Sequence, residues 1–264
     1  MDRASKKQSA QKKQSEKIRL DVLVKQNKIA DSRERARALI LAGKILVDQK
    51  PVDKVGTLVS SDANITMRGE NMPFVSRGGL KLQEALKCSE WSVDGLICMD
   101  VGASTGGFTD CLLQHHAAHV YAIDVGYGQL AWKLRQDHRV TVFEKTNIRY
   151  LERAAISGDI DMITIDTSFI SLKIVVPSCI KFLKPNGRIM ALIKPQFEVG
   201  KQDVGKGGVV RDPQLHQRVI SDLHDFFKAM DLKICFVIES PVLGPKGNKE
   251  FIMGLAWLVE KIMK

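Results

Sequence analysis

Residues 98–110, CMDVGASTGGFTD, decide the fold because they join the end of an apolar strand, a glycine turn and the start of a helix. The run before the turn, residues 95–99, suits a strand that is covered on both faces, as in a parallel sheet. Gly102 can adopt backbone angles closed to other residues, and Gly106 and Gly107 leave room for another group to approach the chain. The amides at the start of the helix favour electron-rich oxygens, so this turn is a candidate ligand site.

The spacing of the glycines indicates the class of ligand. It is G-x-x-x-G-G, which differs from the dinucleotide fingerprint and lacks the Gly-Lys-Ser/Thr of a phosphate-binding loop. Asp100, two residues before the first glycine, is unfavourable beside a pyrophosphate and favourable beside a cation. S-adenosylmethionine carries an ammonium and a sulfonium, so it fits this turn better than a dinucleotide. A second acidic strand end follows at Asp124, about 20 residues further on, where a carboxylate commonly holds ribose hydroxyls. The alternative is an ordinary strand-to-helix turn that binds nothing.

The composition of the whole chain points to a polyanionic partner. The 264 residues contain 40 Lys and Arg against 30 Asp and Glu, which gives a net charge of +10 at pH 7. Nucleic acid is the first candidate, and a basic protein without such a partner is the alternative. The five cysteines lack C-x-x-C spacing and suit a reduced, cytoplasmic protein. We expect no signal peptide, no membrane-spanning segment and no metal site.

Changes in composition predict four segments. Residues 1–17 are rich in Lys, Ser and Gln and nearly free of apolar residues, so we expect a disordered basic tail. Residues 18–67 form a small α+β module, and residues 68–78, with several glycines and a proline, form a linker. The larger domain comprises residues 79–264.

The larger domain alternates between strands and helices. Helices are expected at 79–87 and 213–230, and strands near 95–101, 119–123, 140–143, 159–165, 187–193, 232–238 and 251–258. Such alternation specifies an α/β fold with a doubly wound, Rossmann-like sheet and with ligands at the carboxyl ends of its strands.

The small module resembles a known RNA-binding domain. The segments 19–21 (RLD), 32–36 (SRERA) and 43–47 (GKILV) are similar to the S4 domain, which is named after a ribosomal protein and grips structured RNA. The resemblance implies that the basic side chains of this module contact RNA phosphates. These residues are Arg19, Arg33, Arg35, Arg37 and Lys44. A solvated basic surface is the alternative.

Four charged residues are expected where strands of the larger domain begin or end: Lys81, Asp166, Lys194 and Glu250. Each one alone is most simply a salt bridge or a solvated strand end. Two lysines and two carboxylates around a cofactor turn, however, suit the removal of a proton from a hydroxyl group.

The order and spacing of these four residues resemble the Lys-Asp-Lys-Glu tetrad of FtsJ-like ribose 2′-O-methyltransferases. A wider likeness extends over residues 75–82 (VSRGGLKL), 100–110, 194–198 (KPQFE) and 240–248 (SPVLGPKGN). These segments resemble the TlyA family, also called hemolysins, in which an S4 domain precedes an FtsJ-like methyltransferase. The likeness implies 2′-O-methylation of cytidine in ribosomal RNA, with S-adenosyl-L-methionine as cofactor and ribosomal RNA or ribosomal subunits as partners.

The same resemblance assigns roles to residues. Lys194 is expected to be the base, and Lys81, Asp166 and Glu250 are expected to position it and the ribose. The residues expected to hold S-adenosyl-L-methionine are Asp100, Gly102, Ala103, Ser104, Thr105, Gly106, Gly107, Phe108, Asp124 and Asn147.

Three other functions are weighed against this one. A non-catalytic RNA-binding factor on a methyltransferase fold would have lost tetrad or glycine residues, and none is lost. A membrane-active hemolysin needs an apolar or strongly amphipathic segment, and the sequence offers none that is convincing. A dehydrogenase is disfavoured by the spacing of the glycines.

Overall fold

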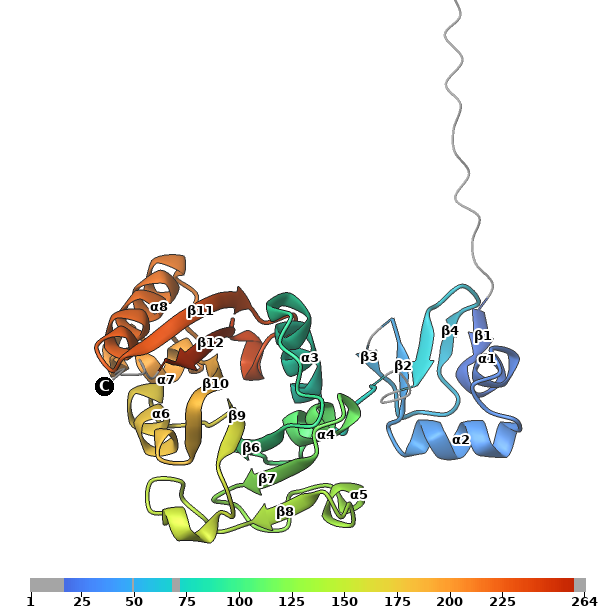
Figure 1. Ribbon diagram of the computed structural model, residues 1–264. Coiled ribbons are helices and arrows are strands. Elements are labelled where there is room, and N and C mark those ends of the chain that lie inside the picture. The colour runs from blue at the N-terminus through green and yellow to red at the C-terminus, as the bar shows by residue number, and fades with distance from the viewer. Residues whose placement is uncertain (1–16, 49, 68–71, 259–264) are drawn as a thin grey trace, which may run out of the picture. The chain divides into compact units, whose positions relative to one another are not determined.

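The computed structural model describes residues 17–48, 50–67 and 72–258 (Figure 1). The chain divides between residues 72 and 73 into two compact units. The predicted basic tail, residues 1–17, lies outside the described residues except for Lys17, which begins the first strand.

The described residues of the small unit form two helices and five short strands. The helices are α1 (Leu20–Gln26) and α2 (Arg33–Leu41), and the strands are β1 (Lys17–Arg19), β2 (Ile45–Val47), β3 (Lys50–Pro51), β4 (Leu58–Ser60) and β5 (Ile65–Met67). Strand β1 pairs with β4, and β2 lies between β3 and β5, all antiparallel. Helix α1 begins at Leu20 and not earlier, because Ile18 pairs with Val59 in the β1–β4 ladder.

The large unit contains a seven-stranded sheet with the order β11-β12-β10-β9-β6-β7-β8. Its strands are β6 (Ile97–Val101), β7 (His119–Ile123), β8 (Val140–Phe143), β9 (Ile160–Ile165), β10 (Leu183–Ile193), β11 (Leu232–Glu239) and β12 (Phe251–Trp257). Neighbours from β10 to β8 are parallel, and β12 is antiparallel to both β10 and β11. The predicted doubly wound sheet is confirmed.

Helices cover both faces of this sheet (Figure 1). They are α3 (Gly78–Ser89), α4 (Gly107–Gln114), α5 (Trp132–Arg135), α6 (Leu172–Ile180), α7 (Pro195–Glu198) and α8 (Pro213–Lys228). Short 3-10 turns lie at Arg153–Ala155, Lys201–Asp203 and Pro245–Gly247. One apolar core joins α3 and α4 to one face of the sheet, and another joins α6 and α8 to the opposite face.

The order of the strands reverses between β6 and β9. At such a switch point the loops after two neighbouring strands diverge and leave a crevice at the carboxyl edge of the sheet. Because β12 is antiparallel to β10, with Phe251 opposite Ile193, the start of β12 lies at this same edge. The topology therefore gathers the ends of β6, β9 and β10 and the start of β12 around one crevice.

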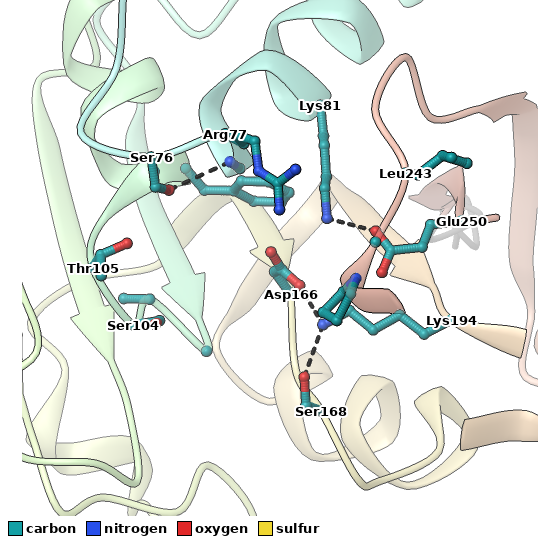
Figure 2. A pocket seen from close by; sticks show the side chains of 17 residues that line it. Ser76, Arg77, Lys81, Ser104, Thr105, Asp166, Ser168, Lys194, Leu243 and Glu250 are labelled. Carbon is teal, nitrogen blue, oxygen red and sulfur yellow. Dashed lines mark hydrogen bonds and ion pairs between the residues drawn. The ribbon is translucent and has the colours of Figure 1, made fainter. Parts of the chain in front are cut away.

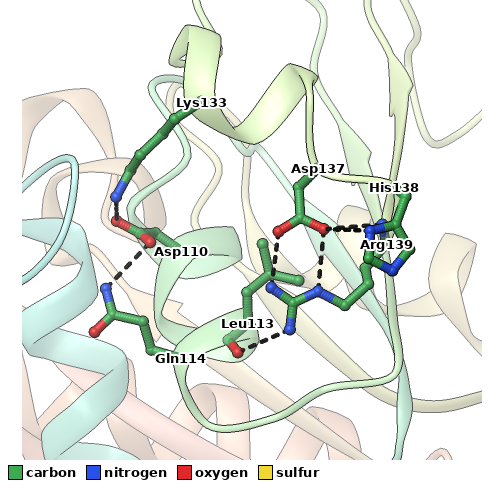
Figure 3. A network of polar contacts seen from close by, with 7 residues as sticks. All are labelled: Asp110, Leu113, Gln114, Lys133, Asp137, His138 and Arg139. Atoms are coloured by element: carbon green, nitrogen blue, oxygen red, sulfur yellow. Dashed lines mark hydrogen bonds and ion pairs between the residues drawn. The ribbon is translucent and has the colours of Figure 1, made fainter.

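The predicted linker, residues 68–78, is only partly a connection. Residues 68–71 lie outside the described residues, whereas residues 73–78 belong to the large unit. Phe74 is buried in the core with α3 and α4, and the backbone N–H of Val75 donates to Asp110 Oδ2 at 2.8 Å. Figure 3 shows Asp110 on α4 with its other two partners, Lys133 and Gln114. These contacts fix the chain to α4 before α3 begins.

All five cysteines are free; Cys98, Cys111 and Cys179 are buried, and Cys88 and Cys235 are exposed. In the described part of the chain, no helix combines the length and the apolar character that crossing a membrane requires.

Candidate active site

A cavity of about 360 Å³ lies at the carboxyl edge of β6 and β9, and all four residues of the predicted tetrad line it (Figure 2). Lys81 comes from α3, and Asp166 follows the last residue of β9. Lys194 follows the last residue of β10, and Glu250 precedes the first residue of β12. Residues up to 169 positions apart in the chain thus meet in one place.

The tetrad forms two ion pairs. Lys81 Nζ lies 2.5 Å from Glu250 Oε2, and Lys194 Nζ lies 2.6 Å from Asp166 Oδ1. Lys81 is 8% exposed, Lys194 7% and Glu250 1%. A buried charge is strongly destabilising unless it is paired, so each lysine has a carboxylate partner of its own. The predicted grouping of the four residues is thereby observed.

Two features of the tetrad were not predicted from the sequence. Lys194 Nζ also donates to Ser168 Oγ at 2.9 Å, so its ammonium has two partners. Glu250 Oε1 is buried and has no hydrogen-bond partner among the described residues. A β-carbon at Gly244 would lie 2.0 Å from this oxygen, so the glycine leaves space that Glu250 occupies.

Gly102 joins the glycine turn to the tetrad. Its φ of +86° lies in the left-handed region that favours glycine, and its N–H donates to Ile123 O at 2.8 Å. A β-carbon at this position would lie 2.6 Å from the carbonyl oxygen of Asp166. The turn after β6 therefore touches the turn after β9, and Gly102 has the kind of backbone angle that the sequence led us to expect.

Gly106 and Gly107 leave room for other parts of the protein, although Gly107 also lines the first cavity. A β-carbon at Gly106 would lie 2.3 Å from Leu134 Cδ1, so the glycine permits packing against α5. A β-carbon at Gly107 would lie 2.9 Å from the backbone nitrogen of Gly79. Gly107 thus allows α4 to pack closely against α3, and Gly106 lines no cavity that we identify among the described residues.

A second cavity, of about 520 Å³, adjoins the first. The two share Gly102, Ser104, Asp166 and Ser168. Among the residues predicted to hold the cofactor, Gly102, Ser104, Asp124 and Asn147 line this second cavity, whereas Ala103, Thr105, Gly107 and Phe108 line the first. Asp124 accepts hydrogen bonds from the N–H of Ser104 at 2.7 Å and of Gly126 at 2.6 Å, so its carboxylate also organises the glycine turn.

The sequence and the fold are similar to those of known proteins, which indicates what these cavities bind. Residues 74–257 match the FtsJ-like methyltransferase family, and residues 18–65 match the S4 domain. The chain is 45% identical over 240 residues to the 16S/23S rRNA (cytidine-2′-O)-methyltransferase TlyA of Mycobacterium tuberculosis, with 90% of each chain covered. The chain belongs to the TlyA family of FtsJ-like methyltransferases.

Two further comparisons agree with this membership. Hemolysin A of Brachyspira hyodysenteriae is 38% identical over 236 residues, which cover 89% of this chain and 98% of the relative. A solved structure from Streptococcus thermophilus, named as a hemolysin, matches with a TM-score of 0.72 and 40% identity over 92% of this chain and 89% of that chain. The predicted cofactor, S-adenosyl-L-methionine, is confirmed by membership in this methyltransferase family.

The second cavity of this TlyA-family chain fits a nucleoside such as that of S-adenosyl-L-methionine. Its size is in the usual range for small-molecule sites. Ile148, Ile170 and Val175 give it an apolar wall, and Asp124 provides a carboxylate. The hydroxyl oxygen of Thr167 is buried there and has no hydrogen-bond partner among the described residues, so it is free to bond a polar ligand.

Asp100 does not occupy the position predicted for it. It is 0% exposed, lies under the turn and lines none of the three cavities described. Asp100 Oδ2 accepts from the N–H and the hydroxyl of Thr109, and Thr164 lies 3.2 Å from Oδ1. Burial first, and the nearby charge of Asp166 to a smaller extent, raise the pKa of Asp100 to about 7, although hydrogen bonds from Thr109 and Thr164 act in the opposite direction. Asp100 therefore stabilises the turn and the start of α4 through buried hydrogen bonds.

A third cavity, which the sequence did not predict, borders Lys194 and Ser168. The ring of Phe169 is 90% exposed and lies 4.9 Å from the ring of Phe197, centroid to centroid. The flat face of an exposed aromatic ring suits stacking with another ring.

The basic residues predicted in the S4 domain are exposed, but they do not form a single face. Arg19 and Arg33 both bond the buried carboxylate of Asp21, at 2.9 and 2.6 Å. Arg33 and Arg37 lie one turn apart on α2, whereas Arg35 lies on the opposite flank of the helix. Lys44 is exposed beyond the end of this helix. Two of the predicted contacts thus also stabilise the domain itself.

Proposed function

We propose that this protein transfers a methyl group from S-adenosyl-L-methionine to the 2′ hydroxyl of a cytidine in ribosomal RNA, with Lys194 as the base. The observation that carries the proposal is the pair of lysine–carboxylate contacts in a cavity that shares walls with the nucleoside-sized cavity. The enzyme name of the Mycobacterium tuberculosis relative supports the choice of substrate.

The chemistry requires a base because a ribose hydroxyl is a poor acid. When bound, S-adenosyl-L-methionine supplies a methyl group on a positively charged sulfur. Lys194, once its amine has lost a proton, accepts the hydroxyl proton, and Asp166 holds the amine in place at 2.6 Å. A general base of this kind contributes about 10²- to 10⁴-fold to the rate.

Lys81 and Glu250 form the other half of the tetrad. Lys81 keeps its positive charge beside Glu250 and offsets the negative charge that develops on the attacking oxygen. Glu250 Oε1, which has no partner among the described residues, is free to accept a hydrogen bond from a neighbouring ribose hydroxyl. The tetrad therefore provides one group to remove the proton and others to hold the ribose.

Recognition of the RNA is shared between the units in this proposal. Residues 18–67 bind structured RNA through exposed basic side chains, and residues 73–258 carry out the transfer. The exposed ring of Phe169, beside Lys194 in the third cavity, provides a surface on which an unpaired base can stack. The reaction takes place in the cytoplasm, where ribosomal RNA is found.

The test measures transfer of labelled methyl groups to ribosomal subunits by Lys194→Ala and Lys194→Arg. Both variants should bind cofactor and RNA yet lose about 10²-fold or more in rate, since arginine stays protonated and cannot accept the proton. Lys233→Ala, an exposed lysine on β11, is the matched control and should retain activity.

The position of the label completes the test. A methyl group on a 2′ oxygen blocks alkaline cleavage at that nucleotide, because the oxygen can no longer attack the adjacent phosphate. Label on a nucleobase, or full activity of Lys194→Arg, would contradict the proposed function.

A further inference from the structure

Ser168 is the residue that connects the three cavities. It lines the first cavity with the tetrad, the second with Asp124, and the third with Phe169. Ser168 is exposed and lies two residues after Asp166, beyond the end of β9. A side chain at this position is in reach of the cofactor site, the base and the RNA site at once.

The contacts of Lys194 show what the serine hydroxyl does there. An ammonium group has three N–H bonds. Two of them are directed to Asp166 Oδ1 at 2.6 Å and to Ser168 Oγ at 2.9 Å (Figure 2). No third polar partner of this amine is found in the part of the chain that the structure describes. The remaining direction is therefore left for a group that enters the cavities that Lys194 lines.

Loss of one proton from the amine leaves two N–H bonds and one lone pair. Because Asp166 and Ser168 both accept hydrogen bonds, they retain the two N–H bonds, and the lone pair occupies the third direction. With Ser168 removed, the amine keeps one fixed N–H bond and can rotate about it. Its lone pair is then spread over several directions, and only some of them reach an incoming hydroxyl group.

We propose that Ser168 is a positioning residue for methyl transfer, which directs the lone pair of Lys194 toward the ribose 2′ oxygen. In the step that it assists, the O–H bond of the ribose breaks and its proton forms the third N–H bond of Lys194. The proposal rests on the proposed function because it takes Lys194 as the base. Ser168 lies outside the Lys-Asp-Lys-Glu tetrad, so it adds a fifth member to the site.

The experiment compares Ser168→Ala with Ser168→Thr and with Ser178→Ala. The threonine variant keeps the hydroxyl, whereas Ser178 lies on α6, bonds Ile174 O and lines none of the cavities. The rate of single-turnover methyl transfer to ribosomal subunits is measured between pH 6 and 10, within the range in which the subunits are stable. Cofactor affinity is measured separately by calorimetry.

Ser168→Ala should lower the plateau rate by about 10- to 100-fold, the usual penalty for a misdirected catalytic group. Cofactor affinity and the KM for the subunits should change less than about twofold. The acidic limb of the pH–rate profile should move to lower pH, because a protonated amine that loses an acceptor gives up its proton more easily. Ser168→Thr should restore both the rate and the profile, and Ser178→Ala should match the wild type.

The outcomes separate this proposal from the one on which it rests. If Lys194→Ala keeps its activity, the proposed function is wrong. If Lys194→Ala is inactive and Ser168→Ala has the wild-type rate and profile, Ser168 has no positioning role. A Ser168→Ala variant that loses activity only through weaker binding of the cofactor would likewise overturn the inference. Should the alanine variant fail to fold, an unchanged profile in Ser168→Cys, whose thiol is a weak acceptor, would have the same meaning.

Discussion

The α-carbon of Gly102 faces the carbonyl oxygen of Asp166 so closely that a β-carbon on Gly102 would lie 2.6 Å from that oxygen. The contact links the glycine turn after β6 to the strand end that carries one member of the tetrad. The same two residues are shared by the first and second cavities. The cofactor turn and Asp166, the ion-pair partner of the proposed base Lys194, are therefore held together by backbone, without an intervening side chain.

Gly102→Ala should consequently destabilise the large unit and slow transfer. The left-handed backbone and the clash with a carbonyl group that cannot move aside together cost about 2–5 kcal/mol. Gly95→Ala is the matched control, because Gly95 also has a positive φ, +71°, and a β-carbon there would meet nothing within 4 Å. Thermal unfolding should show a loss of about 1 kcal/mol for the control. Equal losses in the two variants would mean that the contact with Asp166 is not tight.

Asp100 should make the stability of the large unit depend on pH. Its pKa rises from 3.8 to about 7 on folding, chiefly through burial. The folded state therefore holds a proton that the unfolded state releases, and the free energy of unfolding should fall by up to about 4 kcal/mol as the pH rises from 4 to 7. Asp100→Asn should remove this fall, since an amide can accept from Thr109 and donate to Thr164 without ionising.

Tryptophan fluorescence during urea unfolding measures this effect in the large unit alone. All three tryptophans, Trp91, Trp132 and Trp257, lie there. If the free energy of unfolding changes with pH in the same way in the wild type and in Asp100→Asn, Asp100 is ionised in the folded protein and the prediction is wrong.

The sheet of the large unit could be predicted because its strands are apolar on both faces and end at polar residues. Strands β7 and β8 have the predicted bounds, His119–Ile123 and Val140–Phe143. Asp166 and Lys194 could be located for the same reason, since a charged residue directly after an apolar run marks the edge of a parallel sheet. Pairing of the charges was not predictable, because the partner of each lysine depends on the register of β12 against β10.

Other features were not predictable because they depend on contacts between distant residues. Asp100 lies two residues before Gly102, and only its burial beneath Thr109 shows that it points away from the cavities. Strand β1 has three residues and is specified by β4, about 40 positions further along the chain, rather than by its own pattern. Ser168 carries no signal in the sequence beyond its distance of two residues from Asp166.

Asp124 should contribute to cofactor affinity. Its carboxylate lines the second cavity at the end of β7, and hydrogen bonds to a charged group are worth about 1.5–3 kcal/mol. Asp124→Ala should therefore weaken binding of S-adenosyl-L-methionine by about 10- to 150-fold in calorimetry. Asp94→Ala, at an exposed carboxylate outside the cavities, should bind normally. An unchanged affinity in a folded Asp124→Ala variant would place the ribose of the cofactor elsewhere.

Arg35 and Arg37 allow RNA binding to be tested without unfolding the S4 domain. Reversing the charge of Arg33 would be ambiguous, since Arg33 bonds Asp21, which is 0% exposed. Burial raises the pKa of Asp21, but hydrogen bonds from Arg19 and Arg33 outweigh burial and hold it below its ordinary value. Removing Arg33 would leave this carboxylate short of a partner and destabilise the domain. Arg35 and Arg37 are exposed on either flank of α2 and have no such role.

The double variant Arg35→Glu/Arg37→Glu should therefore bind ribosomal RNA more weakly while its cofactor affinity stays the same. Each phosphate contact releases counterions, so the slope of log K against log salt should fall by about 1 to 2. Lys228→Glu/Lys233→Glu changes the net charge equally on the exposed surface of the large unit and controls for long-range attraction. If the two double variants have the same slope as each other, the arginines of α2 act only through net charge. A slope that falls only in the α2 variant places RNA phosphates against this helix.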